Sequence, residues 1–194
     1  IKSALGFDSE RNIGITFYPA MQAAHILYPT FKYKLPSLGV VGIDQDVFVK
    51  LTRDVASKLN LEKPGSIMSK FMPSLLGNSK MSSSDKYSAI YTTDSPKEIE
   101  IKLKKAFSGG KDTVKEHKEK GGNPEIDVCF QYLSLFLEED ENKLKEIYTK
   151  YKSGEMLTSE LKEYTIKKAQ KFLLEHQKKR EKSKELVDKF ILKA

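Results

Sequence analysis

The chain has 194 residues, of which 39% are hydrophobic, so it can form one large domain or two small ones with buried cores. A single cysteine, Cys129, excludes a disulfide framework within the chain and favours a reducing compartment, while no apolar run reaches the length of a membrane span. The net charge of +7 permits a polyanionic partner, and we expect a cytoplasmic protein with no membrane partner.

A helix, a strand and a second helix are the first predicted elements. Apolar residues recur at helical spacing over residues 16–28, and because proline lacks a backbone N–H we place the start of this helix just before Pro19. The β-branched run at residues 38–43 predicts a buried strand of a parallel sheet. An amphipathic helix over residues 47–59 follows it.

This order of elements is typical of a nucleotide-binding crevice, which forms at the carboxyl ends of parallel strands. Gly42 would let a nucleotide approach the backbone, and Asp44 can accept hydrogen bonds from ribose hydroxyls. A helix N-cap is the alternative role for Asp44. Gln22, in the middle of the first helix, is either exposed or a buried amide whose partners a ligand can supply.

A loop rich in hydroxyl groups occupies residues 77–85, with the sequence Gly-Asn-Ser-Lys-Met-Ser-Ser-Ser-Asp. Its glycine and asparagine allow sharp bends, and the ammonium of Lys80 with the hydroxyls and backbone N–H groups can wrap a polyphosphate. The apolar run 67–76 and the β-like run 88–92 on either side predict a strand–loop–strand arrangement. A solvated serine-rich turn is the alternative.

The remainder of the chain is helical in its periodicity. Ser95-Pro-Lys-Glu98 is a capping box with proline at the first helical position. Asp112 or Thr113 is predicted to cap a second helix, which stops at Gly121-Gly122-Asn123-Pro124. Further helices are predicted over residues 126–137, 143–151, 161–174 and 186–191. The predicted fold class is α/β plus all-α, with one domain over residues 1–95 and a helical domain over residues 96–194.

Positive charge is concentrated near the end of the chain. Residues 141–194 hold 15 Lys and Arg against 9 Asp and Glu. Lys- and Glu-rich helices are more often solvated than bound to nucleic acid, so the charge alone assigns no partner.

Several stretches resemble the tryptophanyl-tRNA synthetases of the eukaryotic and archaeal type. The hexapeptide at residues 80–85 is similar to the KMSKS signature of class I aminoacyl-tRNA synthetases, and the octamer Ala-Phe-Ser-Gly-Gly-Lys-Asp-Thr at residues 106–113 is the most diagnostic match. The other matching stretches, in the order of the family, are residues 17–24, 43–46, 51–56, 121–123 and 154–161.

The resemblance implies the second half of a Rossmann-type catalytic domain in residues 1–95 and an anticodon-binding bundle in residues 96–194. It also implies a ligase that joins tryptophan to ATP as tryptophanyl-adenylate and transfers the acyl group to tRNA(Trp) in protein synthesis. ATP brings Mg²⁺ on its phosphates, and no metal ligand of the chain is expected. The full-length enzymes of this family are homodimers.

The resemblance also assigns roles to single residues of the catalytic half. Catalytic roles fall on Lys80, which stabilises the pyrophosphate leaving group, and on Ser82 and Ser84, which help to hold the loop against it. The ATP-binding residues implied are Gly42, Asp44, Lys80, Met81 and Ser82. The residues implied to reach the polar end of tryptophan are Gln22 and Gln45.

In the helical half, the resemblance implies that Phe107, Lys111 and Asp112 read the tRNA anticodon. They would supply an aromatic face, a cation and an acceptor beside a flexible turn at residues 109–110. The alternative is that Phe107 belongs to the core and that Lys111 and Asp112 are a plain helix cap.

Two departures from the family pattern bear on function. Ser83 stands where the family signature has a second lysine, so the cationic role of the loop falls on Lys80. The chain has no match to the His-containing HIGH signature, and its first residue is not methionine. We therefore expect the C-terminal portion of a synthetase, inactive by itself. The alternatives are a module that only binds tRNA and a tyrosyl-tRNA synthetase.

Overall fold

The computed structural model describes residues 13–77, 81 and 85–191. The chain divides into two compact units, Ile1–Phe71 and Met72–Ala194. Each unit is described by itself.

The N-terminal unit is built around a β–α–β motif. Helix α1 (Ile13–Tyr33) leads into strand β1 (Leu38–Gly42), a short 3₁₀ turn η2 (Ile43–Gln45), helix α2 (Asp46–Lys58) and strand β2 (Gly65–Ser69). The strands pair in parallel, with Val40 opposite Ile67. The predicted strand, its parallel pairing and the predicted second helix are confirmed.

Helix α1 begins earlier than predicted, because Pro19 lies inside it and not at its first turn. The side chains of Pro19, Ala23, Leu27 and Thr30 are all buried and recur at helical spacing. Packing of α1 against α2 therefore holds the helical backbone through a residue that cannot donate its hydrogen bond. The prediction was wrong because it weighed the proline alone.

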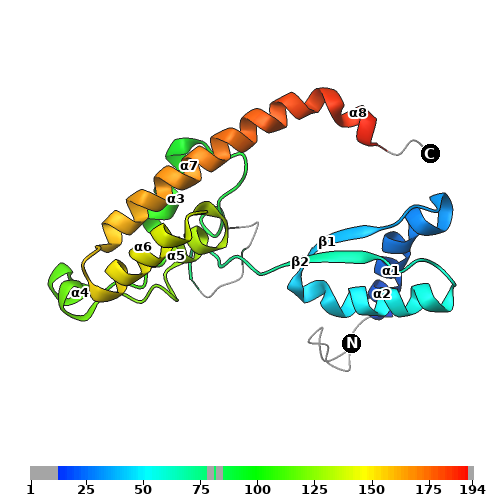
Figure 1. Cartoon of the computed structure of the whole chain (residues 1–194), viewed down its shortest axis with the longest axis horizontal. Coiled ribbons are helices and arrows are strands. Elements are labelled where there is room, and N and C mark those ends of the chain that lie inside the picture. The colour runs from blue at the N-terminus through cyan, green and yellow to red at the C-terminus, as the bar shows by residue number, and fades with distance from the viewer. Residues whose placement is uncertain (1–12, 78–80, 82–84, 192–194) are drawn as a thin grey trace. The chain divides into compact units, whose positions relative to one another are not determined.

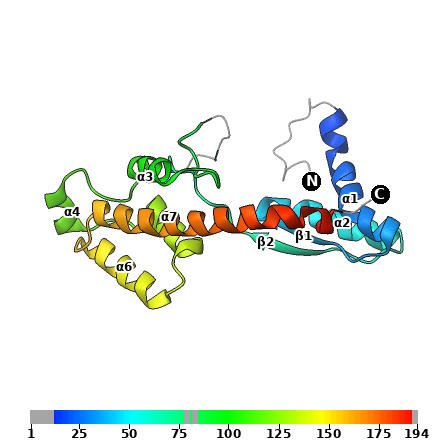
Figure 2. The same ribbon diagram turned by 90° about the horizontal axis from the view of Figure 1, so that it is seen from above.

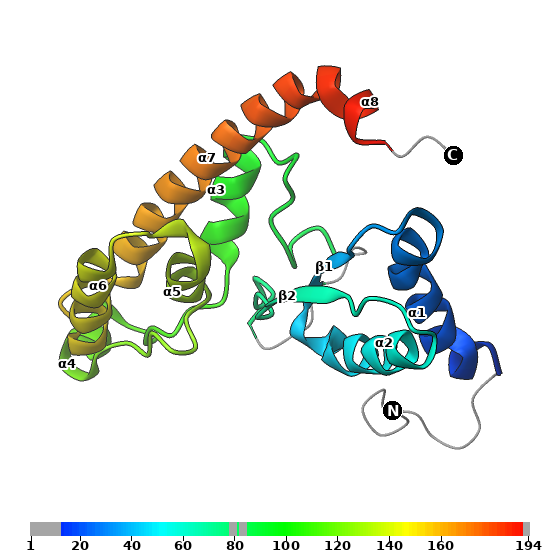
Figure 3. The same cartoon turned by 45° about the vertical axis from the view of Figure 1, so that its right-hand side comes forward.

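The two faces of the β1–β2 pair differ. Helix α2 runs along one side of the pair (Figures 1 and 3). On one face Val41 and Met68 are partly buried, whereas Leu38, Val40 and Ile67 on the other are 65%, 74% and 56% exposed. The prediction of a buried strand is therefore wrong for one face within the described residues.

The second unit is helical. It contains α3 (Pro96–Lys105), α4 (Val114–Lys120), α5 (Val128–Tyr132), the π-helical turn η3 (Leu133–Leu137), α6 (Glu141–Ser153), α7 (Thr158–Ser183), the 3₁₀ turn η4 (Lys184–Leu186) and α8 (Val187–Phe190). Figure 2 shows α3 and α6 on opposite sides of the long helix α7, which contacts both. Within the described chain, no helix combines the length and the apolar character that crossing a membrane requires.

Local sequence rules account for most helix ends in this unit. The Ser95–Glu98 capping box is present, and the Thr113 hydroxyl accepts from the backbone N–H of Glu116 at 3.1 Å. Gly121, at φ +71°, ends α4, and Gly154, at φ +82°, ends α6, a backbone region that favours glycine. The predicted capping box and the stop at Gly121 are confirmed, and Thr113 is the cap of the second predicted helix.

The core of the helical unit is continuous. Its fully buried side chains include Leu103, Leu133, Ile147 and Leu161, and Cys129 is buried among them. Burial raises the pKa of the Cys129 thiol to about 12, so the thiol is neutral and acts as a small apolar side chain.

The segment 72–95 belongs to the helical unit. The sequence predicted a domain boundary at residue 95, whereas the compact units divide at residues 71 and 72. Within this segment Leu75 donates its backbone N–H to the Ser88 carbonyl at 2.9 Å, and Tyr91 donates to the Asp94 carboxylate at 2.8 Å. The strand predicted over residues 88–92 is absent from this described stretch. Isolated hydrogen bonds to side chains and to one turn replace the regular backbone hydrogen bonds that pair two strands.

Candidate functional site

A polar cluster lies at the carboxyl end of β1. The Gln22 amide nitrogen, from α1, donates to the Gln45 amide oxygen at 2.8 Å, and the Gln45 amide nitrogen donates to the Asp44 carboxylate at 2.7 Å. Gly42 is the last residue of the strand, and a Cβ added there would lie 2.6 Å from Asp44 Oδ1. Four predicted site residues of the N-terminal unit are therefore neighbours.

The cluster keeps acceptors available for a ligand. The Gln22 oxygen Oε1 is buried without a hydrogen-bond partner among the described residues. A buried acceptor of this kind costs free energy unless a donor reaches it. Asp44 is exposed and does not cap α2, whose N-cap is Gln45 with no side-chain cap bond. The N-cap alternative for Asp44 is thus excluded, and its carboxylate faces solvent beside the glycine.

The predicted phosphate loop is described only in part. Lys80, Ser82 and Ser84 lie outside the described residues. Met81 is partly buried and packs against the core of the helical unit.

The described residues before and after this loop are tied to one another. Ser88 donates its backbone N–H to the Asp85 carbonyl at 3.0 Å, and the Ser74 hydroxyl donates to the Ser88 carbonyl at 3.1 Å. Gly77 has φ +95°, and a Cβ there would lie 3.0 Å from Cγ of Phe107. Residues 74–77 and 85–88 consequently form a closed base from which the loop departs.

Phe107 is partly packed and partly exposed. Its backbone N–H donates to the Leu75 carbonyl at 2.7 Å, and its ring packs on Gly77. The side chain is still 43% exposed. One part of the ring therefore contributes to packing while the rest is exposed to solvent.

Lys111 and Asp112 both project from the surface of the helical unit. Both side chains are exposed, and Thr113, not Asp112, caps α4. In the described part of the chain, Asp112 accepts no hydrogen bond and Lys111 forms no ion pair. Lys111 is close enough to lower the pKa of Glu116, although the main cause of that shift is the hydrogen bond from Lys120. The pair offers a cation and an anion to a partner.

The sequence alone did not indicate the buried residues that support the turn at residues 109–110. The buried Asp127 carboxylate accepts from the backbone N–H of Gly109 at 2.9 Å, from that of Phe130 at 3.1 Å and from the Tyr151 hydroxyl at 2.8 Å. An aspartate directly before an apolar helical run is a recognisable N-cap signal. That signal predicts the bond to Phe130 but not the bonds to Gly109 and Tyr151.

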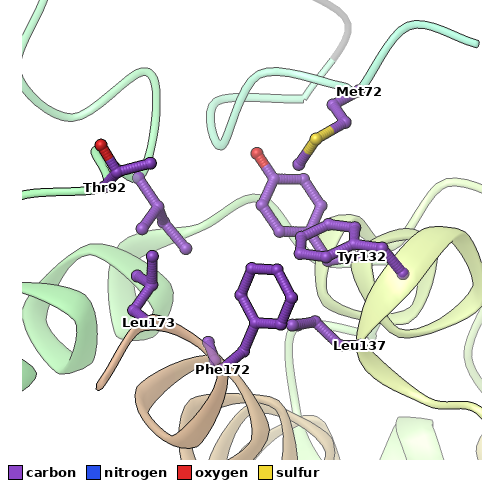
Figure 4. A pocket seen from close by; sticks show the side chains of 9 residues that line it. Met72, Thr92, Tyr132, Leu137, Phe172 and Leu173 are labelled. Atoms are coloured by element: carbon purple, nitrogen blue, oxygen red, sulfur yellow. The ribbon is translucent and has the colours of Figure 1, made fainter. Parts of the chain in front are cut away.

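A separate cavity of about 190 Å³ lies in the helical unit (Figure 4). The rings of Tyr132 and Phe172 and the side chain of Leu173 point into it, and Met72 and Thr92 close its rim. None of the predicted site residues lines it. In the part of the chain that is described, no three His, Cys, Asp or Glu side chains gather into a possible metal site.

A comparison with known protein families assigns the chain to one of them. Residues 3–174 match the family described as tRNA synthetases class I (W and Y), where W and Y denote tryptophan and tyrosine. The chain belongs to this family. The resemblance seen in the sequence is confirmed, and the fold is that of a class I tRNA synthetase with mostly helical content.

Relatives within the family are similar over nearly the whole chain. The tryptophan–tRNA ligase of Saccharolobus solfataricus is 48% identical over 192 residues, which is 98% of this chain and 50% of that protein. The Plasmodium falciparum tryptophanyl-tRNA synthetase structure has a TM-score of 0.73 at 42% identity and covers 93% of this chain and 49% of that one. For the tryptophanyl-tRNA synthetase of Aeropyrum pernix the TM-score is 0.81 at 33% identity, with 96% and 52% covered. The chain thus spans about half the length of these class I synthetases.

Proposed function

We propose that the chain is the half of a tryptophan–tRNA ligase that carries the KMSKS-like loop and the anticodon-binding helices. The observation that carries the proposal is 48% identity to a tryptophan–tRNA ligase over almost every residue of the chain. In this proposal the N-terminal unit is the second half of a Rossmann-type catalytic domain. The helical unit is the anticodon-binding bundle, to which the segment 72–95 is attached.

The cluster at the end of β1 suits the reactants of adenylate formation. Gly42 leaves room for the adenosine, and Asp44 accepts hydrogen bonds from its ribose. The unpartnered Gln22 oxygen accepts from the tryptophan ammonium group, while Gln45 orients Gln22 through their 2.8 Å bond. Because the tryptophan carboxylate is itself the nucleophile, these residues act by positioning.

The phosphate loop is assigned charge stabilisation. Lys80 holds the pyrophosphate as it leaves, Ser82 and Ser84 help to hold the loop against it, and the backbone at Met81 meets the adenine. Fixed donors aimed at developing charge are the usual source of catalysis in phosphoryl chemistry. Mg²⁺ enters as the counter-ion of the ATP phosphates and not through ligands of this chain.

In the helical unit, Phe107 stacks on an anticodon base while Lys111 and Asp112 bind base edges. Support comes from the exposure of all three side chains and from the absence of competing partners for Asp112 within the described residues. Single-stranded bases are commonly recognised by such stacking and edge contacts. The partner is tRNA(Trp), the enzyme is a cytoplasmic homodimer, and the bare face of the sheet is covered by the rest of the synthetase.

The test is tryptophan-dependent ATP–pyrophosphate exchange by the full-length synthetase. Lys80→Ala should lower the exchange rate by about 10² or more, the scale of one lost charged contact to a transition state. Lys86→Ala is the matched control, because Lys86 is six positions further along the sequence and is paired with Glu98 at 3.3 Å. Near-normal exchange by Lys80→Ala, or an equal loss in both variants, would contradict the role given to Lys80.

A second function follows from the half-length coverage. The chain by itself would bind tRNA(Trp) without forming adenylate, because half of the relatives' length is outside it. Assays of the 194-residue chain for tRNA binding and for exchange distinguish the two functions. Exchange by this chain without any further polypeptide would refute the binding-only function.

A further inference from the structure

A buried polar network supports the turn that precedes Lys111 and Asp112. Tyr151, from α6, donates its hydroxyl to the Asp127 carboxylate at 2.8 Å and lies 3.2 Å from the hydroxyl of Thr158. Asp127 and Tyr151 are fully buried. Burial, and then the nearby Asp127 charge, raises the pKa of Tyr151, so the phenol keeps the proton that it donates.

The network reaches two consecutive backbone positions of the turn. Asp127 accepts from the N–H of Gly109, whose carbonyl accepts from the N–H of Asn123 at 2.8 Å. Gly110 lies against Thr158, since a Cβ added at Gly110 would be 2.2 Å from the Thr158 hydroxyl. A Cβ at Gly109 would be 1.9 Å from the Asn123 carbonyl oxygen. Both glycines are therefore enclosed closely enough for their backbone course to be set from beneath.

The residues that follow the turn have no comparable support. Lys111 and Asp112 are exposed, and the next anchored residue is Thr113, which caps α4. The two side chains thus lie between fixed points, the network on one side and the cap on the other. Their direction depends on where Gly109 and Gly110 are held.

We infer that Asp127, Tyr151 and Thr158 are positioning residues that orient Lys111 and Asp112 for anticodon recognition. The inference rests on the proposed function and adds to it residues that never touch the RNA. A turn held by a charged acceptor and close packing meets the anticodon already ordered, so less conformational freedom is lost on binding. Loosening it should weaken the recognition of bases and leave amino-acid activation unchanged.

The test compares two buried tyrosines in the full-length synthetase. Tyr151→Phe removes the hydroxyl that joins Asp127 to Thr158. Tyr132→Phe is the matched control, because Tyr132 is equally buried and donates to the Pro73 carbonyl at 2.9 Å beside the cavity of Figure 4. Both variants keep the ring, but Tyr151→Phe loses its bonds to the Asp127 carboxylate and to Thr158, whereas Tyr132→Phe loses one bond to a neutral carbonyl. Tyr151→Phe should therefore lose more thermal stability than Tyr132→Phe, and the tRNA parameters are compared at a temperature where both variants are folded.

Three quantities are measured for both variants: the KM for tRNA(Trp) in aminoacylation, the preference for it over a transcript with one altered anticodon base, and the tRNA-free exchange rate. Tyr151→Phe should raise the KM about tenfold, the scale of one mismatched base contact, and reduce the preference, with kcat and exchange unchanged. Tyr132→Phe should leave all three unchanged. Thr158→Val, which removes the hydroxyl but retains the volume, should raise the KM in the same direction.

The inference is overturned if Tyr151→Phe and Tyr132→Phe change the tRNA parameters equally, or if exchange falls in parallel with the KM effect. Failure of the proposed function has a different signature. It would appear as absence of tryptophan-dependent exchange in the unaltered protein, before any variant is compared.

Discussion

The two units differ in how completely they bury their apolar residues. The helical unit encloses a continuous core that includes Leu103, Leu133, Ile147 and Leu161. The N-terminal unit buries a short stripe on α1 and α2 and leaves Val40 and Ile67 exposed on its sheet. Two strands seldom form an independently stable sheet, whereas several helices around one core can. The helical unit is therefore better able than the N-terminal unit to fold by itself.

The two candidate sites also differ in how their polar groups are arranged. In the N-terminal unit the polar groups of Gln22, Gln45 and Asp44 bond to one another and leave an acceptor open. In the helical unit the exposed Lys111 and Asp112 follow a turn whose Gly109 is bonded to a buried network. The first cluster is partly buried, whereas the second pair of side chains is exposed to solvent.

The largest expected effect concerns the buried ion pair of the helical unit. Lys102 and Asp94 lie 2.5 Å apart, and the Lys102 side chain is 1% exposed. Lys102→Met would leave the Asp94 carboxylate buried without its cation, which should lower the free energy of unfolding by about 3–5 kcal/mol. Urea denaturation measures the change.

The matched control for that prediction is Lys104→Met on the same helix. Lys104 pairs with Glu100 at 2.6 Å, but the Lys104 side chain is 64% exposed. Exposed pairs contribute little, so no measurable change is expected. Equal effects of the two substitutions would show that the ion pair is not the source of the stability.

The next largest loss of stability is expected for substitution of a glycine in the helical unit, and a glycine in the N-terminal unit is its control. Gly121→Ala places a Cβ 1.8 Å from the Lys152 carbonyl oxygen at φ +71°, and the backbone strain alone should cost about 1–3 kcal/mol. Gly39→Ala in β1 meets nothing closer than 3.8 Å and should fold normally. Thermal unfolding of both variants measures the difference, and tolerance of Gly121→Ala would contradict the described end of α4.

Glu138 should contribute to the loss of folding stability at low pH. Burial raises the pKa of this carboxyl, but hydrogen bonds from Lys168, Tyr164 and the backbone N–H of Asp140 outweigh it and lower the pKa to about 2. Because the folded pKa lies below the ordinary value of 4.5, the stabilisation is present above pH 4.5 and is lost as the pH falls toward 2. Glu138→Gln should therefore lower stability at pH 7 and flatten its decline between pH 4.5 and 3. Parallel pH profiles of the two proteins, measured by urea denaturation, would contradict this role.

The smallest effect on stability is expected on the exposed face of the sheet. Val40→Thr together with Ile67→Thr should change the unfolding free energy of the 194-residue chain by no more than about 0.5 kcal/mol. Self-association of this chain at high concentration should decrease, because an exposed apolar face promotes it. Analytical ultracentrifugation measures association, and a large loss of stability would indicate that the face is buried.

How much the sequence predicts depends on whether the signal is local. The Ser95–Glu98 box and the stop at Gly121 are set by adjacent residues, and both are confirmed. The start of α1 was wrong because packing of Pro19 and its neighbours outweighs a local rule. The strand predicted at residues 88–92 was wrong because its backbone makes isolated bonds, Ser88 with Leu75 and Asp85 and Tyr91 with Asp94, in place of a strand ladder.

The candidate sites follow the same division. Gly42, Asp44 and Gln45 are close in sequence to a strand end, where nucleotide sites are expected. Gln22 was also predicted, and the structure shows that this residue of another element bonds to Gln45. The network beneath residues 107–112 joins residues 24 and 18 positions from Asp127, so no local pattern identifies it. For Phe107, the exposure of the side chain was predicted from the sequence, whereas its packing on Gly77 was not.

The most direct measurement is ATP–pyrophosphate exchange by the full-length synthetase with tryptophan, with tyrosine and with neither. The account predicts exchange that depends on tryptophan and is lost in Lys80→Ala. Exchange supported by tyrosine in place of tryptophan would assign the chain to the tyrosyl enzymes of the same family. Absence of exchange with either amino acid would contradict the proposed ligase.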